Sequence, residues 1–199
     1  HPAASVTFVA TSTLTLTVTG KGSVTASSAP IGVGETTTCN AAKAASATCT
    51  YTYDETKGAV TFTTSADTGW DFRSFSDAIS CSGDPSVCTW TVGASNVTST
   101  ATFLQRYSLF VDITGTGTVS LSPAPVSGDS SCSADCTVYY GNTDVVTLTG
   151  TGSGAWDFIS LGGDAVCSGG VCTVTIDNQD KTATALFKER KTLTLTVTG

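Results

Sequence analysis

The sequence predicts an all-β, or mainly β, fold of tandem small β-sheet modules, β-grasp-like or sandwich-like, that are stapled by disulfides. Threonine alternates with Val, Leu, Ile or Phe along much of the chain, which is the period of a half-buried strand. Residues 13–20, Thr-Leu-Thr-Leu-Thr-Val-Thr-Gly, return letter for letter at 192–199, and a diverged version occupies 109–115. Such repetition is typical of a tandem array.

The opening strand of each copy shows the alternation most clearly. In residues 13–19 the leucines and the valine face one side, and the threonines face the other. Gly20-Lys-Gly22 and Gly115-Thr-Gly117 follow as predicted hairpin turns, because glycine tolerates the positive φ that such turns require. Apart from one possible helical turn within 39–49, helical spacing is nearly absent. We predict about six short strands per copy, with one sheet face buried and the threonine face in water.

The two halves of the chain match in one conserved order of segments. The pairs are 14–24 with 109–119, 59–63 with 145–149, 69–72 with 155–158, 89–92 with 173–176, and 98–103 with 181–187. Six matches in register, counting the paired cysteines Cys81 and Cys88 with Cys167 and Cys172, are not expected by chance. We therefore predict a closing strand of a preceding repeat at 1–12, module 1 at 13–105, module 2 at 106–190, and the opening strand of a following repeat at 191–199.

Eight cysteines, four in each half, predict disulfides rather than metal sites, because the chain has a single histidine. They are Cys39, Cys49, Cys81, Cys88, Cys132, Cys136, Cys167 and Cys172. Four cysteines in one copy allow three pairings. Local pairing (Cys39–Cys49, Cys81–Cys88, Cys132–Cys136, Cys167–Cys172) is favoured because each copy can then fold without its neighbour. Disulfides imply an oxidising compartment, and we expect an extracellular or cell-surface protein.

Composition excludes several classes of partner. The net charge of −7, with only nine basic residues, disfavours nucleic acid and anionic membrane surfaces. No apolar run approaches the roughly 20 residues of a spanning helix, so membrane insertion of this segment is not expected. His1-Pro-Ala-Ala-Ser leads directly into a strand-like stretch without a charged and apolar leader, as expected of a mature product or an excerpt.

The order of the motifs resembles the divergent internalin-B-type B-repeats of bacterial surface and secreted proteins. In the first copy the motifs lie at 14–24, 60–63, 81–83, 88–92 and 100–103, and in the second at 109–119, 132–136, 145–149, 167–169, 172–176 and 182–187. The resemblance implies β-grasp-like modules used as spacers or attachment units, without catalytic residues. The chain departs from the family at Phe75 and Leu161, where a Gly-Trp pair is common.

We expect no catalytic residue, cofactor or metal. His1 is the only histidine, so a serine nucleophile lacks its base and a copper site lacks a second imidazole. Asp71 and Asp157 are equivalent positions of two copies rather than an acid/base pair. Some loop side chains have calcium-binding chemistry, but their spacing matches no calcium loop, and solvated turns are the favoured reading. They are Asp129, Asp135, Asp164, Asp177, Asn178 and Asp180.

The sequence predicts a non-enzymatic, extracellular structural repeat protein of a stalk, adhesin or filament. Its partners would be copies of itself or adjacent repeats, with a cell-surface glycan or protein as a further partner. Assembly would use the end strands, whose apolar positions are Val6, Phe8, Leu193, Leu195 and Val197. The alternative is a carbohydrate-binding module that stacks sugars on aromatic rings, although core packing is the favoured role for those rings. They are Trp70, Trp90, Trp156, Tyr139 and Tyr140.

Overall fold

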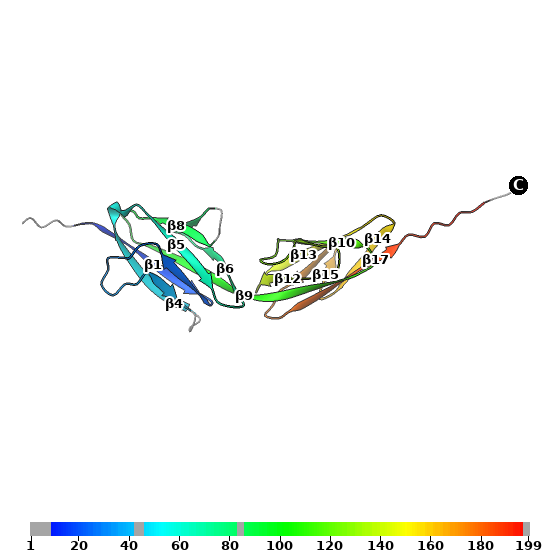
Figure 1. Ribbon diagram of the computed structural model, residues 1–199, viewed down its shortest axis with the longest axis horizontal. Coiled ribbons are helices and arrows are strands. Elements are labelled where there is room, and N and C mark those ends of the chain that lie inside the picture. The colour runs from blue at the N-terminus through cyan, green and yellow to red at the C-terminus, as the bar shows by residue number, and fades with distance from the viewer. Residues whose placement is uncertain (1–8, 42–45, 83–85, 197–199) are drawn as a thin grey trace, which may run out of the picture. The chain divides into compact units, whose positions relative to one another are not determined.

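The computed structural model describes residues 9–41, 46–82 and 86–196, which fall into two compact units (Figure 1). Unit 1 is His1–Gln105 and unit 2 is Arg106–Gly199. Among the described residues the regular elements are β-strands, with one short 3-10 helix, η1 (Glu55–Lys57). The predicted fold class, all-β modules stapled by disulfides, is confirmed, and each unit is a two-sheet sandwich.

Unit 1 contains one sheet of four strands and one of five. In the first sheet the order is β6 (Trp70–Phe75), the 97–105 part of β9 (Val97–Thr114), β1 (Thr11–Thr19) and β4 (Ser46–Asp54). β1 is parallel to β9, and the other neighbours are antiparallel. The second sheet is antiparallel throughout, in the order β3 (Thr38–Asn40), β2 (Gly22–Ala26), β5 (Ala59–Ala66), β8 (Val87–Thr91) and β7 (Ser80–Cys81).

Unit 2 repeats both sheets strand for strand. Its first sheet runs β12 (Cys136–Gly141), the 106–114 part of β9, β17 (Lys181–Glu189) and β14 (Trp156–Gly163). Its second sheet runs β11 (Ser131–Cys132), β10 (Gly117–Ser122), β13 (Val145–Gly152), β16 (Val171–Thr175) and β15 (Val166–Ser168). The parallel pair keeps its register, since Leu14 lies opposite Val97 in unit 1 and Leu109 opposite Lys181 in unit 2.

Each core lies between the two sheets of its unit. Leu14, Leu16 and Val18 are fully buried while the threonines between them are partly exposed, so the predicted alternation of the opening strand is confirmed. Tyr51 of the first sheet meets Phe62 of the second edge to face, with ring centroids 5.3 Å apart. Side chains of both sheets therefore fill one core, and burial of each large one contributes about 1.5–3 kcal/mol.

The prediction of about six strands per copy is wrong. Nine strands in two sheets form each unit among the described residues. The missed strands β3, β7, β11 and β15 have two or three residues each, too few to show an alternation. The predicted helical turn within 39–49 is not seen at 39–40, which end β3, at residue 41, which has no regular structure, or at 46–49, which begin β4. Its centre lies outside the described residues.

The Gly-x-Gly turns are tight, but they are not hairpins. β1 and β2 belong to different sheets, so 20–22 forms a corner between the two layers. A Cβ atom on Gly20, whose φ is 82°, would lie 2.1 Å from the carbonyl oxygen of Phe103, and one on Gly22 would lie 2.5 Å from its ring. Residues 115–117 approach Phe187 in the same way. Glycine is required here because the corner crosses the end of the closing strand.

The predicted boundary of the first strand is also corrected. Thr11 and Ser12, assigned above to a preceding repeat, are part of β1, where they pair with Asp54 and Tyr53 of β4. Ser12 is fully buried, and its hydroxyl donates to the backbone oxygen of Ser95 at 2.7 Å. These contacts hold both residues in unit 1.

The loop between β2 and β3 in unit 1 is held to β4 by the carboxylate of Glu35, by a bond from the N–H of Ile31 to the Thr52 oxygen and by one from the Tyr53 hydroxyl to the Ser28 oxygen. Glu35 accepts hydrogen bonds from the backbone N–H of Thr52 at 2.7 Å, from the Thr52 hydroxyl at 2.7 Å and from the N–H of Gly32 at 3.2 Å. Burial raises the pKa of Glu35, but the hydrogen bonds outweigh it and hold this pKa below its ordinary value.

Acidification is expected to loosen this loop, because it weakens the hydrogen bonds to Glu35 and leaves those of Ile31 and Tyr53 in place. Because the pKa of Glu35 is lower in the folded chain, its contribution is complete at neutral pH and is lost as the pH falls through the folded pKa, below about 4.3. Hydrogen exchange of 27–37, corrected for the intrinsic rate, should then speed up. Glu35→Gln should show the faster exchange already at pH 7 and little further change with acid, and equal protection in both proteins at pH 7 would contradict this role.

Candidate functional site

Two disulfides join the two sheets of the sandwiches. Cys39 of β3 is bonded to Cys49 of β4 in unit 1, with Cα atoms 5.8 Å apart. In unit 2, Cys132 of β11 is bonded to Cys136 of β12, with Cα atoms 6.0 Å apart. Each bond links an edge strand of one layer to an edge strand of the other, so it closes one side of the sandwich.

The other two disulfides lie within the second sheet of each unit. Cys81 and Cys88 are directly opposite on β7 and β8, with Cα atoms 4.2 Å apart. Cys167 and Cys172 are opposite on β15 and β16, with Cα atoms 4.0 Å apart. All eight cysteines are paired, on the pairs that the local scheme names. Four disulfides fit a protein that folds in an oxidising compartment.

The first and last strands of each unit lie side by side, and one side chain ties their starts together. In unit 1 the side-chain oxygen of Asn96 accepts from the N–H of Thr13 at 2.9 Å. In unit 2 the carboxylate of Asp180 accepts from the N–H of Ser108 at 2.8 Å. Asn96 and Asp180 each directly precede the last strand. The sequence pattern did not predict this parallel pairing.

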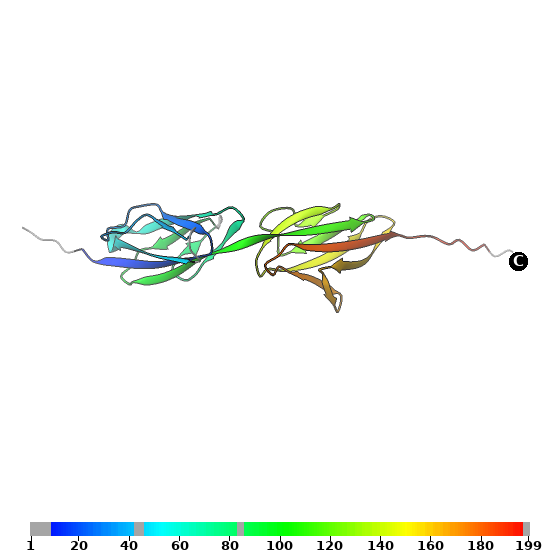
Figure 2. The same ribbon diagram turned by 90° about the horizontal axis from the view of Figure 1, so that it is seen from below.

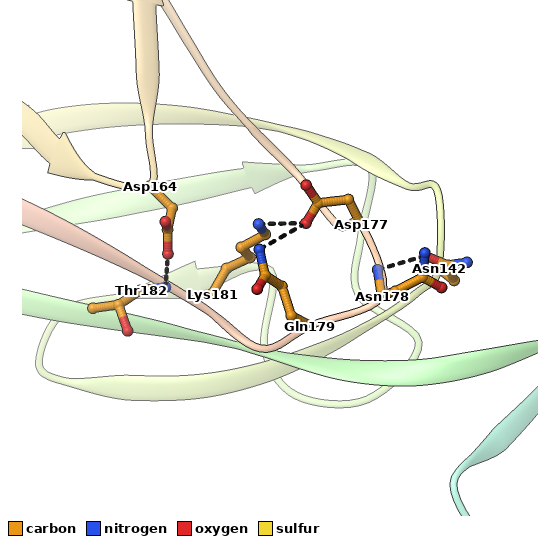
Figure 3. Close-up of polar contacts among 7 residues, drawn as sticks. All are labelled: Asn142, Asp164, Asp177, Asn178, Gln179, Lys181 and Thr182. Carbon is orange, nitrogen blue, oxygen red and sulfur yellow. Dashed lines mark hydrogen bonds and ion pairs between the residues drawn. The ribbon is translucent and has the colours of Figure 1, made fainter.

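The loop acids considered for calcium are used within the protein itself. Asp164 accepts from the N–H of Thr182 at 2.7 Å, and Asp177 contacts Lys181 and Gln179 (Figure 3). The N–H of Asn178 donates to the side chain of Asn142 at 2.9 Å.

Three other candidates complete the set. Asp135 accepts from the N–H of Ile113 at 2.8 Å, Asp180 binds Ser108 as described above, and Asp129 is exposed. Among the described residues, no group of three His, Cys, Asp or Glu side chains is placed to hold a metal ion.

The two acids flanked by Trp and Phe lie in different units. Asp157 forms an ion pair with Arg190 at 3.4 Å, and Asp71 lies on β6 of unit 1. His1 falls outside the described residues.

Burial raises the pKa of Tyr140 to about 12, with the charge of Asp144 adding to the effect, so Tyr140 stays protonated at neutral pH.

The aromatic residues considered for sugar binding mostly belong to the cores. Trp90 and Tyr140 are buried, and Trp70 and Trp156 are partly buried against their cores. Tyr139 is 37% exposed, with the guanidinium of Arg106 5.7 Å from its ring centroid. The described residues do not gather these rings into one platform.

The predicted assembly strands lie partly outside the described residues, as Val6, Phe8 and Val197 do. Leu193 and Leu195 are described, and they are 91% and 80% exposed. Residues 191–196 form no strand within this chain, so the opening strand predicted there is not formed. Its sequence nevertheless equals that of buried β1, whose leucines are fully covered.

Comparison with known proteins gives two similar solved structures. No known protein family matches the chain, and no curated protein matches it either. The TIE protein of Bacillus anthracis is 8% identical with a TM-score of 0.30, covering 91% of this chain and 34% of that one. An adhesin of Mobiluncus mulieris with intramolecular disulfide, isopeptide and ester cross-links is 11% identical with a TM-score of 0.28, covering 72% of this chain and 67% of that one.

This chain spans about a third of the length of the TIE protein. We take no residue role from either structure. Among the described residues, no helix has the length and apolar character to cross a membrane.

Proposed function

We propose that the chain is an extracellular structural tandem-repeat protein of a surface stalk, adhesin or filament, whose units are joined by strand continuation. The observation that carries the proposal is β9. Its 97–105 part is the last strand of unit 1, and its 106–114 part is the first strand of unit 2. One uninterrupted strand thus passes from one repeat to the next without a linker.

The spacing at this join recurs where unit 2 ends. Phe103 is a buried residue of the closing strand of unit 1, and Leu109 begins the buried set of the next opening strand, six residues later. Phe187 and Leu193 have the same spacing. Residues 192–199 are therefore in register to serve as the opening strand of a further unit.

Burial supports the same role for this segment. Leu193 and Leu195 occupy the positions of Leu14 and Leu16, which are 0% exposed in unit 1. Covering each leucine would contribute about 1.5–3 kcal/mol. Because 192–199 and 13–20 are identical, the segment has the side chains to serve as the first strand of a following unit, or to replace β1 between β4 and β9 in a second copy. The partner is an adjacent repeat or a second copy of this chain.

The disulfides support the extracellular part of the proposal. Disulfides in every unit suit a protein that works outside the cell, where no reductant maintains free thiols. The resemblance to internalin-B-type B-repeats and the absence of catalysis stay predictions.

Removal of residues 192–199 is expected to abolish end-to-end association while leaving both units folded. Sedimentation velocity and negative-stain electron microscopy of the concentrated chain measure the association. A sharper pair of variants is Leu193→Asp/Leu195→Asp, which charges the face that would be buried, against Thr194→Asp/Thr196→Asp, which charges the wet face. The leucine pair should prevent association and the threonine pair should weaken it far less. Unchanged assembly after the deletion would overturn the proposal.

A further inference from the structure

We propose that each unit is a mechanical clamp that resists force along the chain through shear of its first strand against its last. The inference deepens the proposed function, because a stalk, adhesin or filament must carry tension. The element that carries the tension is the parallel strand pair in the four-stranded sheet of each unit.

The pairing in unit 1 sets the direction of the load. The first strand begins at Thr11, and the last strand leaves the unit at Gln105. β1 and β9 are parallel neighbours (blue and green in Figure 2), so the start of β1 and the end of the 97–105 part of β9 lie at opposite ends of the pair. Tension therefore acts along the strands, and the hydrogen bonds of the six register pairs from Leu14–Val97 to Thr19–Thr102 are loaded together.

Unit 2 has the same load path. Its first strand begins at Arg106, and β17 ends at Glu189. Six parallel pairs connect them, from Leu109–Lys181 to Thr114–Leu186. An antiparallel pair of terminal strands would instead present both chain ends at one side, and its bonds would break one after another.

Neighbouring strands and the core protect the hydrogen-bond ladder between β1 and β9 in unit 1. β1 lies between β4 and β9, and β9 lies between β1 and β6, so neither strand is an edge. The inner face beneath the pair is covered, since Leu16, Val18 and Ala101 are 0% exposed. Water that could replace a strained hydrogen bond is thus kept from one side of the ladder.

The disulfides take a different part in the response to force. They join β3 to β4 and β7 to β8 in unit 1, and none connects β1 to β9. The clamp can therefore open with all disulfides intact. The closed loops, of 10 and 7 residues in unit 1 and of 4 and 5 in unit 2, then limit how much chain is released.

Single-molecule pulling of the whole chain from its two ends tests the direction of load. The comparison places one handle before residue 9 and the other on an azide-bearing side chain at position 94, in the exposed loop before β9. That geometry pulls both strands from the same end and unzips them, starting at the Asn96–Thr13 bond. Unit 1 should open at a several-fold lower force than in end-to-end pulling, and equal forces would overturn the clamp.

A pair of proline variants tests the ladder itself. The N–H of Thr13 points toward Asn96, so period two directs the N–H of Thr17 to the β9 side. The N–H of Thr52 points away from β1 to Glu35, so that of Thr48 also faces the free edge. Thr17→Pro and Thr48→Pro remove the same hydroxyl contact of 3.4 Å, but only the first removes a bond to β9.

Thr17→Pro should lower the unfolding force of unit 1 and Thr48→Pro should leave it nearly unchanged, with unit 2 as the reference in each trace. Equal forces for the two variants would count against the ladder. If Thr17→Pro does not fold, the comparison of pulling directions on the unsubstituted chain still decides the matter.

Reduction identifies the two units in the force traces. At about 3.5 Å per residue, opening the loops lengthens the released chain of unit 1 by about 50 Å and that of unit 2 by about 20 Å. The unfolding force should fall only slightly on reduction, because no disulfide crosses the parallel pair of first and last strands. These outcomes do not depend on residues 192–199, so failure of the association experiment and failure of the clamp are distinguishable.

Discussion

Reduction of its two disulfides is expected to lower the free energy of unfolding of unit 1 by about 5 kcal/mol, from the chain entropy released by loops of 10 and 7 residues. The loops of unit 2 are shorter, at 4 and 5 residues, and give about 4 kcal/mol. A domain of this size has only about 5–15 kcal/mol in total, so both units should be marginal when reduced. Urea unfolding with and without dithiothreitol measures the effect.

Single-bond variants separate the contributions. Cys39→Ala/Cys49→Ala removes the bond between the sheets, and Cys81→Ala/Cys88→Ala removes the bond within one sheet. Each should cost about 2–3 kcal/mol in unit 1 and leave the transition of unit 2 in place. A reduced chain as stable as the oxidised one would show that the cores alone hold the units together.

Phe103→Ala is expected to destabilise unit 1 by about 3–5 kcal/mol, the usual cost of deleting a buried phenylalanine. Phe103 is 2% exposed, it meets Phe72 at a centroid distance of 5.4 Å, and its ring lies against the corner glycine Gly22. The cavity would open where the first and last strands meet the turn between the sheets. Thermal or urea unfolding should then show two transitions, with the one of unit 1 shifted.

Phe187→Ala is the matched control in the other unit. Phe187 is 1% exposed, and its ring contacts Phe158 and Gly117. These contacts match those of Phe103 with Phe72 and Gly22 in unit 1. The substitution should shift the transition of unit 2 and leave that of unit 1 unchanged, because the two cores share no residues. If either variant shifted both transitions equally, the units would not be independent.

Part of the fold follows from local sequence. Alternation in 13–19 predicts which side chains of β1 are buried, since a strand turns successive residues to opposite faces. Cysteine spacing names pairs close enough in the chain to bond without a distant partner. The sequence holds a single histidine, and among the described residues no group of three His, Cys, Asp or Glu side chains is placed to hold a metal ion.

Other features required the three-dimensional structure. The edge strands β3, β7, β11 and β15 have two or three residues, so they form because a longer neighbour supplies their hydrogen bonds. The sequence predicts a hairpin turn at Gly20 and Gly22. In the structure this turn is a corner between the two sheets, and Phe103 lies against both glycines. The sequence favours a solvated turn for Asp180, and only the fold brings it and its counterpart Asn96 to the N–H groups of Ser108 and Thr13.

The amino-acid sequence by itself determined that the chain is a β protein, which faces of its strands are apolar, and where its cysteines can pair. These are local properties, fixed by periods of two and by short separations along the chain. Only the tertiary structure decided that each unit is a sandwich and that its first and last strands are parallel neighbours. That pairing joins residues more than 70 positions apart, and no local pattern encodes the partner of a strand whose two edges are chemically alike.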